Sequence, residues 1–279
     1  MTADLLRLRK WPAAWLMLGV WLLLSGLFSF LFPYLSYRSS GSGGFSTEGA
    51  SKAELLSSML PAQLPVMLVS GTPMFGGAIL LILGALAAGS GYSWGTWKTV
   101  LTQGRTRLQV ARGLFLALLV AVMVFVLVTL VYDLALSLLV ASAEGQALTL
   151  PGGFALLKAL GGTVLISALW TAAGVFIGLL ARGPALAVGL GLVWALVVEN
   201  LLRAVGGLLD WLNPITDHLP GTAAGSLAAA VGATPASSPD GTPGVVTSLT
   251  GTAATATAAI YLVAFVALAA MLLRRRDVA

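Results

Sequence analysis

Long apolar runs separated by short polar stretches dominate the sequence. Six runs approach or exceed the roughly 20 residues that an α-helix needs to cross a bilayer, and each contains at most one charged residue. They cover residues 12–32, 64–88, 114–140, 157–180, 185–202 and 253–273. The pattern therefore predicts an all-α, polytopic membrane protein with six transmembrane helices, which together form a single transmembrane domain over residues 1–279.

Proline and glycine interrupt the outer half of the second run. Pro61, Pro65 and Pro73 remove backbone donors, and Gly71 and the pair 76–77 lie close to them. Such breaks are tolerated at membrane depth only where neighbouring groups or a water-lined cavity satisfy the freed backbone atoms. We expect a kinked helix that packs against its neighbours rather than a broken helix that lines a cavity.

Composition agrees with a bilayer as the natural solvent. The chain is 58% hydrophobic and only 9% charged, whereas a soluble domain carries roughly a quarter charged residues. It has no cysteine and a single histidine, His218, so disulfides, thiolate chemistry and a zinc site are excluded or disfavoured. The first run is longer than a signal-peptide core and lacks a small-residue cleavage site after it, which indicates a retained span. We expect no cofactor or metal.

Charge then predicts the orientation. With both termini in the cytoplasm, the inner side holds eleven of the fifteen basic residues and two of the ten acids. Basic residues accumulate in the short cytoplasmic connections of membrane proteins. An even number of spans is needed, because an odd number would place the C-terminal "RRRD" on the opposite side. We expect a multi-pass protein of a bacterial-type inner or plasma membrane with cytoplasmic N- and C-termini.

The one sizeable inner connection is residues 91–113, "GYSWGTWKTVLTQGRTRLQVARG", which contains four basic residues and no acid. We expect an amphipathic helix over 96–111, with its apolar side chains on one side and its polar ones mostly elsewhere. The apolar set is Trp97, Val100, Leu101 and Leu108, and the polar set is Lys98, Gln103, Arg105 and Arg107. Two interpretations stay open: a membrane-surface helix held by anionic lipid, and a docking element for a soluble partner.

This segment, with the basic "LLRLRKWPAAW" before the first span, resembles the permease subunit of ABC-2-type transporters. In that family a segment near E-Y-x-x-G-T-x-x-x-L-L precedes S-R and a further base at the start of the third span. The residues that match are Tyr92, Gly95, Thr96, Leu101, Arg107 and Arg112, while the usual Glu falls on Gly91. The later "ALWTAAGVFIGLLARGPALAVGLGLVWALVV" and "LNPITDHLPGTAAGSL" also resemble the family's fourth and fifth spans and outer loop.

The resemblance implies a transporter in which membrane-spanning subunits and ATP-binding subunits are separate chains. Two permease subunits, identical or paralogous, pair in the membrane, and each docks a cytoplasmic ATP-binding cassette subunit through a coupling helix between spans 2 and 3. Most relatives export. The docking residues expected here are Trp94, Gly95, Thr96, Trp97, Lys98, Leu101, Arg105 and Arg107.

The chain itself lacks the residues for ATP hydrolysis. A P-loop needs Gly-Lys-Ser/Thr, but the four lysines follow Arg, Ser, Trp and Leu, never Gly. We therefore expect no enzymatic activity in this chain, with ATP bound by the partner subunit. The alternative function is a non-transporting assembly or immunity protein whose basic loop binds membrane lipid. The basic termini lack the interleaved aromatic residues of a nucleic-acid site, so no nucleic-acid partner is expected.

Four charged residues in or beside the spans are candidate intramembrane polar sites: Asp133, Lys158, Glu199 and Arg203. Asp133 and Lys158 flank a short hairpin and are a candidate ion pair, and Glu199 and Arg203 have i,i+4 spacing. We favour solvated positions at the outer headgroup boundary over a polar lining of an outer vestibule. The G-x-x-x-G motif at 174–178 permits close helix approach, which we expect within the subunit rather than between subunits.

Overall fold

The described part of the chain is built from helices. The computed structural model describes residues 6–7, 9–39, 51–104, 106–238 and 241–275. Within these residues six helices are long and apolar enough to cross a membrane. They are Pro12–Arg38, Pro61–Ser93, Arg107–Ala143, Gly153–Ala181, Pro184–Gly206 and Gly251–Arg275. The prediction of six spans is confirmed, and each predicted range lies inside the corresponding helix.

Three of the spans are uninterrupted α-helices, namely α8 (Arg107–Ala143), α9 (Gly153–Ala181) and α14 (Gly251–Arg275). The other three contain a π-helical turn, which is a local widening of the helix. Span 1 consists of α2 (Pro12–Ser25), η1 (Gly26–Leu31) and α3 (Phe32–Arg38). Span 2 consists of η2 (Pro61–Gln63), α5 (Leu64–Ser70), η3 (Thr72–Gly76) and α6 (Gly77–Ser93). Span 5 consists of α10 (Pro184–Leu192), η4 (Val193–Val198) and α11 (Glu199–Gly206).

Proline explains the interruption of span 2. Pro73 cannot donate a backbone hydrogen bond, and the turn around it widens so that the amide of Gly76 donates to the carbonyl of Gly71 at 3.0 Å. Thr72, which is fully buried, donates its hydroxyl to the carbonyl of Leu68 at 3.0 Å. The broken segment is thus satisfied by local groups, as expected for a kinked packing helix.

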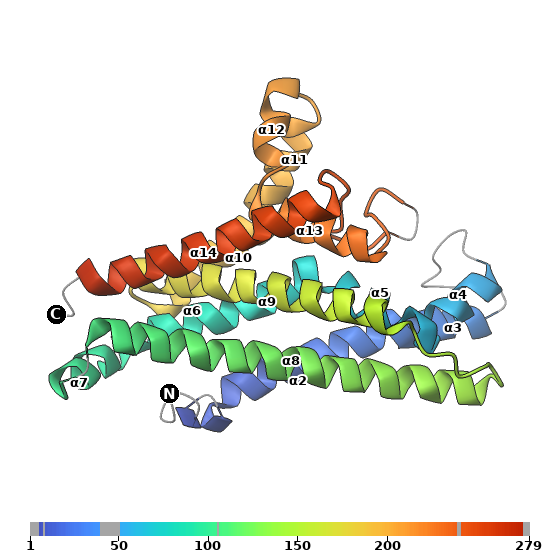
Figure 1. The fold of residues 1–279 in the computed structure, drawn as a ribbon, viewed down its shortest axis with the longest axis horizontal. Coiled ribbons are helices and arrows are strands. Elements are labelled where there is room, and N and C mark those ends of the chain that lie inside the picture. Colours follow the sequence, from blue (N-terminus) through green and yellow to red (C-terminus); the bar gives the residue numbers. More distant parts are fainter. Residues whose placement is uncertain (1–5, 8, 40–50, 105, 239–240, 276–279) are drawn as a thin grey trace.

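The long helices lie side by side, with α9 among α6, α8 and α14 (Figure 1). Shorter helices complete the chain: α4 (Lys52–Ser58), α7 (Thr96–Thr102), the single turns η5 (Asp210–Leu212) and α12 (Asn213–Thr216), and α13 (Pro220–Val231). Figure 1 shows α11 and α12 projecting from the bundle, whereas α13 lies against it. Most of α13 is buried, including Ala223 and Ala224 at 0% exposure.

Apolar side chains cover much of the outside of the bundle. Leu16 on span 1, Val131 on span 3 and Ile260 on span 6 are each about two-thirds exposed. A monomeric soluble protein rarely exposes contiguous apolar surface of this kind. These side chains are therefore placed to face lipid, and the chain is a multi-pass membrane protein.

The charges separate along the bundle. The N-terminal side of α2, α7 and the C-terminal side of α14 lie at one end (Figure 1). We call this the basic end; its described bases are Arg7, Arg9, Lys10, Lys98, Arg107, Arg112, Arg182, Arg274 and Arg275. The described acids all lie elsewhere along the bundle. One of them, Glu144, accepts hydrogen bonds from Tyr34 and Tyr37 at 2.8 and 3.0 Å, and these bonds, with nearby Arg38, lower its pKa.

Glycines bring α6 and α9 into backbone contact. A Cβ atom on Gly84 would collide with the carbonyl oxygen of Thr171, and one on Gly174 would collide with that of Leu81. At Gly178 a Cβ atom would lie 2.8 Å from the carbonyl oxygen of Ala85. The motif at 174–178 therefore packs within the chain, as the sequence predicts.

This contact gives a matched pair of substitutions in one helix. Gly174→Ala inserts a methyl group against the backbone of α6 and should lower the unfolding free energy by about 1–3 kcal/mol, the usual cost of overpacking. Gly161→Ala, also in α9, meets nothing within 4 Å and should be neutral or slightly stabilising. Thermal unfolding in detergent measures both. Equal melting temperatures for the two variants would contradict the close approach of α6 and α9.

Candidate functional site

The connection between spans 2 and 3 contains a short helix rather than the single helix predicted over 96–111. Gly95 (φ +63°) precedes α7, and Gly104 (φ +85°) follows it. A new helix, α8, begins at Arg107, where Thr106 accepts a hydrogen bond from the amide of Gln109 in a capping box. The expectation of one continuous helix was wrong because a glycine in the left-handed region and an N-cap interrupt it.

Trp97 anchors α7 to the bundle. Its side chain is only 5% exposed, and its indole N–H donates to the carbonyl of Ala88 in α6 at 3.2 Å. The indole lies against Gly91, where a Cβ atom would collide with it. A glutamate at 91, as in the family pattern, would not fit under this ring.

A second anchor comes from Arg7, which the sequence did not single out as a site residue. Its guanidinium donates to the carbonyl of Ala87 at 3.2 Å and to the hydroxyl of Ser90 at 2.8 Å. The same group lies 5.8 Å from the ring centroid of Trp11 and 6.0 Å from that of Trp94. Arg7 therefore connects the segment before α2 with the end of α6 and with Trp94, just before α7. The only signal in the sequence was the position of a base before the first span.

The remaining residues of the connection fall into two groups. Those exposed beside or on α7 include Trp94, which is 64% exposed, and the four polar residues Lys98, Thr99, Thr102 and Gln103. Thr96, Val100 and Leu101 are half-buried. Trp97 and Leu101 thus lie toward the bundle while Lys98 faces outward, as the sequence predicts.

Two residues of the predicted 96–111 helix do not belong to α7, and a third lies outside the described residues. Leu108 is 51% exposed and belongs to α8, so it does not share the buried side of α7. Arg107 reaches the other end of the sequence, where its Nη1 donates to the carbonyl of Arg274 at 3.0 Å. Arg105 lies outside the described residues.

Asp133 and Lys158 do not form the ion pair that their positions suggested. Asp133 is 0% exposed and accepts a hydrogen bond from the hydroxyl of Ser25 at 2.8 Å. Lys158 donates to the carbonyl of Ala230 at 2.7 Å. Asp133 lies ten residues before the end of α8, and at 1.5 Å per residue this is about 15 Å from the turn. Asp133 is therefore a buried contact between spans 1 and 3, not a solvated boundary residue.

Glu199 is also buried, and Arg203 is not its hydrogen-bond partner. Glu199 has 0% exposure and accepts from the indole N–H of Trp194 at 2.9 Å and from the amide of Gly221 at 2.7 Å. Arg203 donates instead to the side-chain oxygen of Asn200 at 2.7 Å. Gly221 is near the start of α13, whose first amides have no partner within their own helix. Glu199 therefore holds the N-terminus of α13 against span 5.

Asp133 and Glu199 each accept a hydrogen bond from another helix. Neither buried acid lies beside a second one, and the part of the chain that the structure describes has no group of three His, Cys, Asp or Glu side chains arranged to hold a metal. Among the described residues, α7 with its two anchors presents an accessible surface of exposed polar side chains.

Comparison with protein-family models and with curated proteins gives no match. The resemblance to ABC-2 permeases therefore depends on the short motifs of the sequence.

The buried position of Glu199 predicts a specific stability effect. Glu199→Ala leaves the buried amide of Gly221 and the partly buried indole of Trp194 without their acceptor, and an unsatisfied buried donor costs about 1–3 kcal/mol. Glu199→Gln keeps one acceptor oxygen and should lose less. We expect the apparent melting temperature in detergent to fall in the order wild type, Gln, Ala. Glu54→Ala, which removes an exposed carboxylate that caps only its own short helix α4, is the control, and an equal fall there would contradict the assignment.

Proposed function

We propose that this chain is the membrane-spanning permease subunit of an ABC-2-type transporter, an exporter driven by a separate ATP-binding subunit. The observation that supports this proposal is the form of α7. It is a short helix between spans 2 and 3 whose buried face is fixed by Trp97 and whose outer face presents Lys98 and other polar groups. A helix held only by lipid does not need a buried tryptophan bonded to the preceding span.

The contacts around α7 suggest how motion is passed on. The indole of Trp97 and the guanidinium of Arg7 both bond to the last turns of α6. Gly84 of α6 in turn lies against the backbone of α9. A partner that moves α7 would therefore move α6 and α9 together, because closely packed helices shift as units rather than deform. In the proposal, ATP binding by the partner supplies that displacement.

The proposal also assigns sides and partners. The basic end faces the cytoplasm of a bacterial-type inner or plasma membrane, with both termini there. A cytoplasmic ATP-binding cassette subunit docks on α7, and a second copy or a paralogue completes the path across the membrane. ATP chemistry belongs to the partner, because no lysine of this chain follows glycine as a P-loop requires.

The orientation can be measured directly because the chain has no cysteine. Thr99→Cys places one thiol on the exposed side of α7, and Ser57→Cys places one on α4 at the opposite end. A membrane-impermeant maleimide should label the Ser57 variant in intact cells and the Thr99 variant only after permeabilisation. Labelling of the Thr99 variant in intact cells would reverse the orientation and remove the proposed docking site.

Docking is tested on the complex with its ATP-binding subunit. Lys98→Glu changes the outer face of α7 without touching an anchor, and we expect about a tenfold or greater loss of co-purified partner or of substrate-stimulated ATPase activity. Combining it with Trp97→Ala should also release α7 and deepen the loss.

Lys52→Glu on α4 is the matched charge reversal at the other end of the bundle, and it should leave the complex intact. If no ATP-binding subunit associates with the wild-type chain, and α7 only binds anionic vesicles, the protein is the non-transporting alternative. Unchanged association and ATPase activity in the Lys98 variant would exclude α7 as the docking element.

A further inference from the structure

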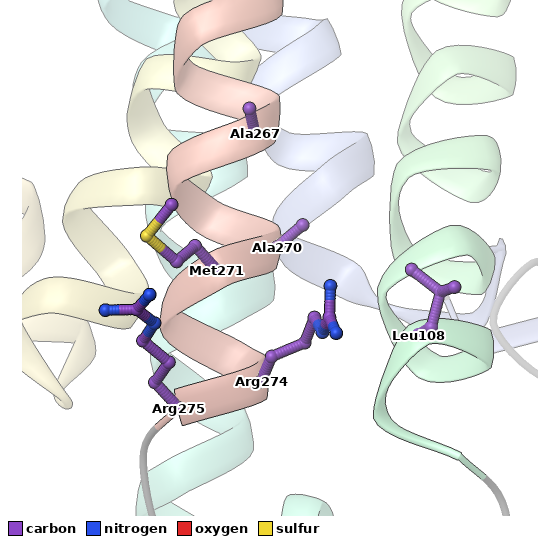
Figure 2. Close-up of a pocket in the computed structure, with 6 residues that line it drawn as sticks. All are labelled: Leu108, Ala267, Ala270, Met271, Arg274 and Arg275. Carbon is purple, nitrogen blue, oxygen red and sulfur yellow. The ribbon is translucent and has the colours of Figure 1, made fainter.

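A cavity of about 410 Å³ lies along the last turns of α14, beside the start of α8, at the basic end. Its lining is apolar except for two arginines, and consists of Leu108, Ala267, Ala270, Met271, Arg274 and Arg275. Figure 2 shows Arg274 extending into the space between α14 and α8, with Leu108 opposite on α8. Met271 and Arg275 lie along the other flank of α14. The volume is within the range of small-molecule sites.

Arg107 bonds to the backbone at the end of α14 and not to the side chains of the two arginines that line the cavity. It donates to the carbonyls of Arg274 and Leu273, at 3.0 and 3.5 Å, and so satisfies the last turn of α14. For the side chains of Arg274 and Arg275 the structure gives no hydrogen bond or ion pair with any described residue, and no described acid lies at the basic end. Two guanidinium groups thus stand beside an apolar cavity without a counter-charge from the described chain.

The surroundings add a third base and an apolar path. Arg112 is exposed and four residues after Leu108 in α8, so it lies on the same face one turn farther into the span. Arg112 does not line the cavity, but helical side chains generally incline toward the helix N-terminus, which is the direction of Leu108. Ala267 and Ala270 are small and continue along α14 toward the middle of the membrane, which leaves room for a chain between the helices.

We propose that this cavity binds one anionic phospholipid from the leaflet at the basic end. The phosphate pairs with Arg274, with Arg275 and Arg112 nearby, since guanidinium forks match phosphate oxygens. One acyl chain lies along Ala267 and Ala270. A soluble protein partner fits less well, because the apolar part of the cavity continues into the span where lipid is the solvent.

Binding of this lipid would join the ends of α8 and α14. Its phosphate would supply a counter-charge that the described residues do not, and its chain would fill space that the small side chains leave open. The inference does not depend on transport or on the ATP-binding partner. It needs only that the basic end lies at a membrane surface.

The test uses the purified full chain in neutral detergent. Phosphatidylglycerol is titrated into the protein, and phosphatidylcholine of the same chain length serves as the comparison lipid. The apparent Kd and the melting temperature of the protein are recorded for each lipid. We expect phosphatidylglycerol to bind more tightly and to raise the melting temperature. Each guanidinium near an anionic headgroup contributes about fivefold in affinity, so Arg274→Gln should weaken binding about fivefold and the double variant with Arg275→Gln roughly 25-fold.

Two further variants distinguish the proposed site from general charge attraction. Arg9→Gln removes an exposed base of the same end away from the cavity and should change nothing. Ala267→Phe fills the apolar path and should weaken phosphatidylglycerol binding while the arginines remain. Inorganic phosphate should compete only poorly.

Three results would overturn the proposal. The first is equal binding of both lipids, and the second is an equal loss from Arg9→Gln. The third is full displacement by inorganic phosphate with no effect of Ala267→Phe, which would mark a simple anion site. Each variant is first compared with wild type in melting temperature without lipid, so that misfolding is not mistaken for lost binding.

Discussion

The backbone contact between α6 and α9 is the constraint on which the rest of the bundle depends. Gly84 on α6, and Gly174 and Gly178 on α9, leave no room for a side chain between the two helices. In a membrane there is little hydrophobic force between helices, so close van der Waals contact of small residues supplies much of the association. Other helices then pack on this pair: α10 on both members, and α5, α13 and α14 on α9.

Buried polar groups hold the more distant parts to this centre. Ser25 and Asp133 connect spans 1 and 3, and Glu199 connects span 5 to α13. An unpaired polar group in hydrocarbon costs several kcal/mol, so these bonds fix which faces meet. The amide of Gly221 receives its acceptor from a residue 22 positions earlier. That pairing places α13 against the bundle although its sequence contains no capping side chain.

The basic end combines two different surfaces. On one side α7 presents Lys98 above an anchor formed by Trp97 and Arg7; on the other, α8 and α14 enclose the cavity beside Arg274. The proposed docking of a motor subunit uses the first surface, and the proposed lipid uses the second. Both depend on positive charge at a membrane face, but they use separate residues.

Hydropathy by itself determined the number of spans and their ranges, because a helix that crosses lipid must be apolar over its whole length. Small-residue spacing also indicated the close contact at 174–178. The partners of the polar residues were decided only by the tertiary structure. Asp133 bonds to Ser25, 108 positions away, rather than to Lys158, and Arg107 reaches Arg274. Sequence spacing predicts neighbours within one helix, whereas the rotation and depth at which separate helices pack determine which side chains meet across them.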